Sequence, residues 1–159
     1  TLDCFLDHPT LAGLVVCVAA DDPYWPGLPC ASDPRIQRAP GGRERCDSVL
    51  SGLQRLGLMG AADQDWVLVH DAARPNLARE DLDKLLHELA ADPVGGLLAV
   101  PARDTLKRAD ADGRVAETVD RSVIWQAFTP QMFRLEMLRD ALGAALGDGV
   151  TTPPLFTTL

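Results

Sequence analysis

The hydrophobic pattern of the chain alternates between short apolar runs and longer amphipathic stretches. Three continuous apolar runs are typical of strands buried on both faces of a parallel sheet: residues 14–18, 66–69 and 97–100. Apolar residues at helical spacing predict helices over three further stretches: residues 43–56, 79–91 and 133–146. The alternation of strand and helix predicts an α/β fold, with a mostly parallel sheet and flanking helices.

Two shorter elements are expected near the start of the chain. Leu2, Phe5 and Leu6 before Pro9 indicate the last turn of a helix, because proline disfavours a helical conformation in the residue that precedes it. A short extended piece is expected around Ile36, after a loop rich in proline and aspartate.

A more polar stretch, residues 102–125, predicts a protruding β-arm. Residues 105–107 and 115–118 flank a turn sequence, DADG, as in a hairpin. Two strands alone do not bury apolar side chains such as Val119 and Trp125. We therefore expect a homodimer through this arm. The alternative is that the arm folds back on its own domain.

Composition narrows the class of protein. The 159 residues, 47% of them hydrophobic and with a net charge of −8, suit one globular domain over residues 1–150 without a basic patch for nucleic acid. The longest nearly apolar run, residues 11–20, is about half of what crosses a bilayer, so no membrane span is expected. The four cysteines form no CxxC pattern and are interpreted as thiols in the cytoplasm. Residues 151–159 match no element and are expected to be an unstructured or artefactual tail.

Candidate chemistry follows the run at residues 66–69. Ligands of open α/β sheets bind beyond the carboxyl ends of the strands, where this chain places His70, Asp71 and Arg74. Asp71 is suited to hold a divalent cation or a polyol hydroxyl, and Arg74 is suited to pair with a phosphate. The alternative is a local salt bridge between Asp71 and Arg74, or a cap of the following helix.

A second candidate site precedes the helix at residues 43–56. Gly41-Gly42 and Ser48 place flexible backbone and a hydroxyl near a helix N-terminus, whose dipole favours anions. The pattern lacks the spacing of a phosphate-binding P-loop, so an ordinary turn is the alternative.

Five ordered blocks of the sequence resemble one family, the 2-C-methyl-D-erythritol 4-phosphate cytidylyltransferases of the non-mevalonate isoprenoid pathway, and the last four resemble it closely. The five are GGRERCDSV at residues 41–49, VLVHDAARP at 67–75, PARDTLKR at 101–108, TVDR at 118–121 and WQAFTPQ at 125–131. The likeness extends over residues 1–150.

The resemblance implies a Rossmann-like nucleotidyltransferase that joins CTP and methylerythritol phosphate with Mg²⁺ and releases pyrophosphate. It assigns Gly42 and Ser48 to the cytidine, and Asp71 and Ala72 to the ribose and the metal-bound triphosphate. It assigns Arg74, Thr105, Arg121 and Thr129 to the methylerythritol phosphate, with Asp71 and Arg121 as the catalytic residues. In the family the arm crosses to the other subunit, so Thr105 and Arg121 are expected to complete the neighbouring site of a homodimer.

The resemblance also shows what this stretch of sequence does not contain. The family begins with a Gly-rich loop that carries an Arg and a Lys, and it ends with a second functional Lys. Here the only lysines are Lys84 and Lys107. We therefore expect either part of a longer protein or a truncated chain with little activity. Two alternatives are an inactive dimerisation or nucleotide-binding module, and a nucleotidyltransferase for another polyol phosphate.

Overall fold

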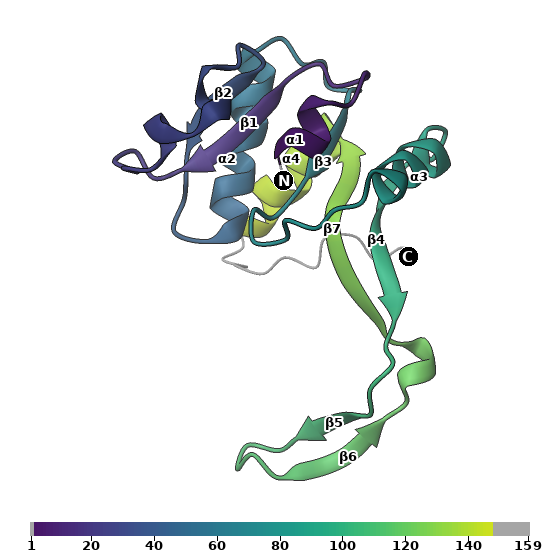
Figure 1. Ribbon diagram of the computed structural model, residues 1–159. Helices are drawn as coiled ribbons and strands as arrows, with labels where there is room; N and C mark the ends of the chain where they lie inside the picture. Colours follow the sequence, from purple (N-terminus) through teal and green to yellow (C-terminus); the bar gives the residue numbers. More distant parts are fainter. Residues whose placement is uncertain (1, 148–159) are drawn as a thin grey trace.

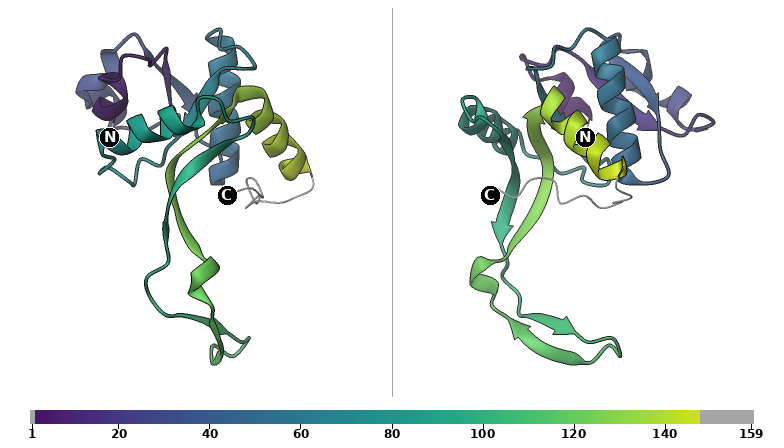
Figure 2. Two further views of the ribbon diagram at one scale, coloured as in Figure 1. Left: turned by 90° about the vertical axis from the view of Figure 1, so that its right-hand side faces the viewer. Right: turned by 180° about the vertical axis from the view of Figure 1, so that it is seen from behind.

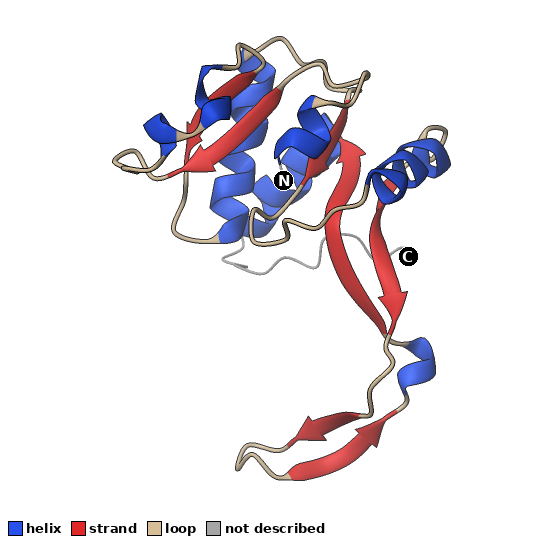
Figure 3. Ribbon diagram, in the orientation of Figure 1, coloured by secondary structure: helices blue, strands red, loops and turns tan. Residues whose placement is uncertain are grey.

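The computed structural model describes residues 2–147 of the chain (Figure 1). The helices are α1 (Leu2–Leu6), α2 (Arg45–Leu58), α3 (Arg79–Leu89) and α4 (Leu135–Gly147), with 3-10 turns at Trp25–Gly27, Pro29–Ser32 and Arg121–Val123. The strands are β1 (Leu14–Val18), β2 (Ile36–Pro40), β3 (Trp66–Val69), β4 (Gly95–Pro101), β5 (Leu106–Ala109), β6 (Val115–Val119) and β7 (Trp125–Arg134) (Figure 3). The α/β class and the elements expected from periodicity are confirmed to within two residues.

The chain is layered, with helices on both faces of the strands. Figures 1 and 2 show α2 and α4 side by side behind the strands, whereas α1 and α3 lie on the opposite face. Strands β1 and β2 pair in parallel, from Leu14 opposite Ile36 to Val18 opposite Pro40. Strand β1 is partly buried along its length, not fully buried as the apolar run at residues 14–18 predicted.

The second sheet has the order β3-β7-β4, with β7 antiparallel to both neighbours. Strands β3 and β4 therefore run in the same direction, as expected, but they do not pair with each other. Strand β7 was not expected, because its outer half is exposed and Pro130 within it lacks a backbone donor. The helix expected to begin at residue 133 begins at Leu135, because Phe133 and Arg134 still belong to β7.

The main hydrophobic core lies between the β3-β7-β4 sheet and helices α2 and α4. Its buried members include Leu53 of α2, Val67 of β3, Phe133 of β7 and Leu138 and Leu142 of α4. Each side chain is 8% exposed or less. This packing fixes the N-terminus of α2 and the ends of β3 and β7 relative to one another, which matters for the site described below.

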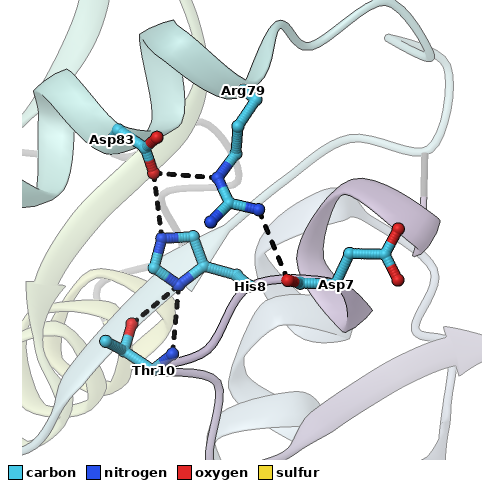
Figure 4. Close-up of polar contacts among 5 residues, drawn as sticks. All are labelled: Asp7, His8, Thr10, Arg79 and Asp83. Atoms are coloured by element: carbon cyan, nitrogen blue, oxygen red, sulfur yellow. Dashed lines mark hydrogen bonds and ion pairs between the residues drawn. The ribbon is translucent and has the colours of Figure 1, made fainter.

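On the opposite face, a polar cluster joins α1 to α3 (Figure 4). His8 follows α1, and its Nε2 donates to Oδ1 of Asp83 in α3 at 3.0 Å. Its Nδ1 accepts from the hydroxyl of Thr10 at 2.8 Å. Arg79 donates to the same Asp83 oxygen at 2.9 Å and to the carbonyl of Asp7. The cluster holds α1 in a position where the ring of Phe5 contacts the imidazole of His70. The two ring centroids are 5.3 Å apart.

The hairpin predicted at residues 102–125 is confirmed as an arm formed by β5 and β6. The two strands are antiparallel around a turn in which Gly113 has a φ of +76°. Figures 1 and 2 show the arm extending away from the layered part of the chain, so in the described residues it does not fold back on its own domain. Val115 and Val123 are exposed, and Trp125 is 50% exposed.

Two sequence-based expectations remain, the tail and the absence of a membrane span. The expected tail at residues 151–159 lies outside the described residues. None of the helices within residues 2–147 combines the length and the hydrophobicity of a membrane-spanning segment.

Candidate active site

Three elements converge where β3 ends. Residues 70–74 follow β3 directly, Arg45 is the first residue of α2, and Thr129 lies in the middle of β7, which pairs with β3. Backbone pairing between Val69 and Gln131 brings Thr129 next to the residues that follow β3. The expected edge of the sheet therefore does collect polar side chains.

Asp71 lies between two guanidinium groups. Its Oδ1 accepts from Nε of Arg45 at 2.9 Å, and its Oδ2 lies 3.5 Å from Nε of Arg74. The Asp71 side chain is 31% exposed, so it is accessible to a ligand while it keeps both partners. The local salt bridge that was the alternative interpretation of Asp71 and Arg74 is present. With Arg45 added, however, the three groups carry a net charge of +1, which suits an anionic ligand.

Thr129 and His70 contact the backbone of the residues that carry these charges. The Thr129 side chain is 7% exposed, and its Oγ1 lies 3.2 Å from the Asp71 backbone nitrogen and 3.1 Å from Nδ1 of His70. Nε2 of His70 lies 3.0 Å from the carbonyl oxygen of Arg74. Desolvation of the imidazole lowers the pKa of His70 below its usual 6.5.

The Gly41-Gly42 segment forms a tight turn at the start of α2. The backbone N–H of Gly42 donates to Oγ of Ser48 at 2.9 Å, and that hydroxyl donates to the carbonyl of Glu44. A Cβ at Gly42 would lie 2.1 Å from Cβ of Asp47, so no side chain fits there. Asp47 itself caps the helix by accepting from the backbone N–H of Glu44. The segment is therefore a hydrogen-bonded turn, and it lies beside the Arg45–Asp71 pair.

Within one chain, the arm residues Thr105 and Arg121 do not lie near Asp71 and its two arginines. Thr105 precedes β5, and Arg121 follows β6, where its guanidinium donates to the backbone carbonyl of Arg103. Figure 1 shows that β5 and β6 lie far from α2 and β3. Ala72, in contrast, is an exposed residue directly beside Asp71.

A cavity of about 1090 Å³ opens next to Arg74. It lies between α3 and the β4-β7 pair, and its lining includes His70, Arg74, Phe128, Thr129 and Trp125. The Arg74 guanidinium lies 5.3 Å from the centre of the Phe128 ring, a cation–π contact that holds it at the cavity wall. A guanidinium beside an open cavity is suited to a small phosphorylated ligand.

The described residues contain no group of three His, Cys, Asp or Glu side chains that could hold a metal by themselves. Asp71 nevertheless fits a Mg²⁺–nucleotide complex, in which one protein carboxylate is often enough because the phosphates and water complete the coordination. Its two oxygens offer about four lone pairs, of which the arginines use two.

The sequence alone did not indicate that Arg45 pairs with Asp71. Arg45 stands within the block at residues 41–49, and its position at the start of a helix was visible in the pattern. Its partner, Asp71, lies far along the sequence, so only the packing of α2 against the sheet reveals the pair.

Comparisons with known proteins give a consistent result. Residues 1–153 match the family model of 2-C-methyl-D-erythritol 4-phosphate cytidylyltransferase (IspD). The chain is 76% identical, over 150 residues, to the protein of that name from Ectopseudomonas mendocina (strain ymp), covering 94% of this chain and 64% of the relative. It is 73% identical to that from Pseudomonas aeruginosa (strain UCBPP-PA14), with the same coverage. The chain thus spans about 64% of the length of these curated relatives.

Solved structures resemble this fold as well. A crystal structure of a 4-diphosphocytidyl-2C-methyl-D-erythritol synthase superimposes with a TM-score of 0.79 at 37% identity, covering 96% of this chain and 76% of that one. The cytidylyltransferase of Francisella tularensis superimposes with a TM-score of 0.80 at 30% identity, covering 94% and 66%. The likeness supports the Rossmann-like fold that the sequence resemblance implied.

Proposed function

Because the chain belongs to the 2-C-methyl-D-erythritol 4-phosphate cytidylyltransferase family, we propose that its site serves the transfer of a cytidylyl group from CTP to methylerythritol phosphate, with release of pyrophosphate. The observation that carries this proposal is the Asp71 carboxylate held between Arg45 and Arg74 at the end of β3. That arrangement offers cationic groups for phosphates and one carboxylate for a metal–nucleotide complex.

The chemistry requires positioning and charge stabilisation rather than an enzyme nucleophile. A phosphate oxygen of methylerythritol phosphate attacks the α-phosphorus of CTP, and pyrophosphate leaves from the opposite side. Negative charge must be stabilised on the oxygens around that phosphorus. Arg45 and Arg74 lie on either side of Asp71 and supply such charge in our proposal.

For the nucleotide side, we assign Gly42 and Ser48 to the cytidine and Asp71 and Ala72 to the ribose and triphosphate. The hydrogen bond from Gly42 to Ser48 holds these two residues together at the start of α2, and the contact of Arg45 with Asp71 joins that region to the residues after β3, which supports this assignment. The net positive charge at Arg45, Asp71 and Arg74 also favours a triphosphate.

We propose that Mg²⁺ accompanies CTP and that Asp71 is its protein ligand. Bound there, the ion would neutralise phosphate charge and orient the triphosphate. The exposed part of the Asp71 carboxylate supports this assignment, and the side chains of Arg45 and Arg74 hold the carboxylate in position for it.

For the polyol phosphate, we assign Arg74 and Thr129 from one subunit and Thr105 and Arg121 from the arm of another. The cavity beside Arg74 supports the first pair. The projecting arm, with Val115, Val123 and Trp125 exposed, supports a homodimer in which each arm is covered by the partner and reaches its site. A cytoplasmic location is consistent with the thiols of Cys4, Cys17 and Cys30, which form no disulfide within the described residues.

The proposal is tested with radiolabelled CTP and the protein in excess over CTP, so that slow turnover is detected. Methylerythritol phosphate is compared with glycerol 3-phosphate and erythritol 4-phosphate, each with Mg²⁺. We expect label in a CDP-linked product and release of pyrophosphate with methylerythritol phosphate in preference to the others. Preference for another polyol phosphate would contradict the substrate assignment, and binding of CTP without any product would favour a nucleotide-binding module.

A further inference from the structure

A chain of hydrogen bonds passes through the imidazole of His70 at the base of the site. It runs from the Asp71 backbone nitrogen to Thr129 Oγ1 at 3.2 Å, from there to His70 Nδ1 at 3.1 Å, and from His70 Nε2 to the Arg74 carbonyl at 3.0 Å. Each distance permits a hydrogen bond, so the remaining question is which atom donates at each step.

The chemistry of the partners fixes these directions. The Arg74 carbonyl oxygen only accepts, so Nε2 of His70 carries the hydrogen. A neutral imidazole has no second hydrogen, and Nδ1 therefore accepts from the hydroxyl of Thr129. The Thr129 oxygen in turn accepts from the backbone N–H of Asp71.

The same contacts restrain the backbone that presents the charged groups. His70 holds the carbonyl of Arg74, Thr129 holds the N–H of Asp71, and the N–H of Arg74 donates to the carbonyl of Asp71 at 3.0 Å. The turn from Asp71 to Arg74 is therefore fixed from both ends. The Phe5 ring meets the imidazole in an edge-on contact and restrains it from the side of α1.

We propose that His70 is a positioning residue of the cytidylyltransferase site: through its two ring nitrogens it directs the hydroxyl hydrogen of Thr129 inward and fixes the Asp71–Arg74 turn. This inference rests on the proposed function. It predicts a greater effect on methylerythritol phosphate than on CTP, because Arg74, whose backbone carbonyl His70 holds, is assigned to the polyol phosphate, whereas CTP is also held by Gly42 and Ser48, which His70 does not contact.

Two variants separate the hydrogen bond between His70 and Thr129 from the hydrogen bond between His70 and the Arg74 carbonyl. In His70→Asn, the side-chain amide can place an oxygen near the position of Nδ1 and keep an acceptor for Thr129. In His70→Gln, the amide can place a donor near the position of Nε2 and keep the bond to Arg74, but the acceptor for Thr129 is lost. Circular dichroism checks that both variants fold.

The first measurement is hydrogen exchange of the Asp71 backbone amide by NMR, which needs no ligand. We expect slow exchange in the unsubstituted chain, exchange about tenfold faster in His70→Gln, and an intermediate rate in His70→Asn. Equal exchange rates in all three proteins would overturn the inference.

The second measurement is calorimetry with methylerythritol phosphate and, separately, with CTP and Mg²⁺. We expect His70→Gln to raise the dissociation constant for methylerythritol phosphate about tenfold and that for CTP less than threefold, with His70→Asn closer to the unsubstituted chain. Equal weakening of both ligands would indicate general loosening and would overturn the positioning role. If the unsubstituted chain bound neither ligand, the proposed function would fail, and the exchange of the Asp71 amide would still decide the role of His70.

Discussion

Nε of Arg45, the first residue of α2, lies 2.9 Å from Oδ1 of Asp71, just beyond the end of β3. The pair joins the turn that begins α2 to the segment that carries Arg74. Both side chains are partly exposed, so the contact contributes little to stability. Its importance is that it fixes a cation and a carboxylate at the place where the nucleotide and the polyol phosphate are proposed to meet.

The turn before α2 requires glycine at position 42. Substitution Gly42→Ala places Cβ against Asp47 and should lower the free energy of unfolding by about 1–3 kcal/mol, because the start of α2 must shift. The matched control is Gly57→Ala within α2, where no atom lies within 4 Å of the added Cβ. That change should raise stability by about 0.5–1 kcal/mol. Urea denaturation measures both, and similar values for the two variants would refute the close-packed turn.

Part of this fold can be predicted from the sequence alone, because some of its elements depend only on residues that are close together in the chain. Strand β1, helix α2 and the β5-β6 hairpin are encoded by short apolar patterns and turn residues, so their positions could be predicted. Strand β7 could not be predicted, because its burial comes from pairing with β3 and β4, which are distant in sequence. Pro130, which lacks a backbone N–H, also makes this segment unlike a central strand. The Arg45–Asp71 contact and the link from Thr129 to His70 depend on that same tertiary packing. Asp71 and Arg74, in contrast, stand directly after a recognisable strand.

Arg121 in the arm is expected to act on one substrate only. Arg121→Ala should raise the KM for methylerythritol phosphate tenfold or more and that for CTP by less than about twofold, because a lost contact to a charged group costs about 1.5–3 kcal/mol. Arg114→Ala is the control, since Arg114 lies at the exposed turn of the same arm. Steady-state kinetics would count against the assignment if Arg121→Ala changed both KM values equally.

Stability should depend on pH through His70. Its pKa is lowered in the folded chain by desolvation, so below about pH 6.5 the unfolded chain takes up a proton that the folded chain resists. The free energy of unfolding should therefore fall as the pH drops from 7 towards 5, more steeply in the unsubstituted chain than in His70→Asn. Denaturation curves at several pH values test this. Parallel pH dependence in the two proteins would show that His70 does not contribute.

The arm is expected to hold two chains together. Sedimentation at micromolar concentration should show a dimer, and Val123→Glu should shift it to monomer, because Val123 is 72% exposed at the base of the arm and a buried, unpaired charge is costly. Leu58→Glu is the control, since Leu58 is 81% exposed at the end of α2. A monomer in the unsubstituted chain, or dissociation by Leu58→Glu alone, would exclude dimerisation through the arm.

The central claim is that the residues around Asp71 form a site for CTP. Calorimetric titration of the chain with CTP and Mg²⁺ tests it most directly, with Arg45→Ala and Arg139→Ala as variants of equal charge. Arg139 pairs with Asp63 and Asp140, away from Asp71. We predict one binding site per chain, weakened about tenfold in Arg45→Ala and unchanged in Arg139→Ala, since only Arg45 borders the proposed triphosphate. No binding of CTP by the folded chain at millimolar concentration, or equal weakening in both variants, would contradict the account.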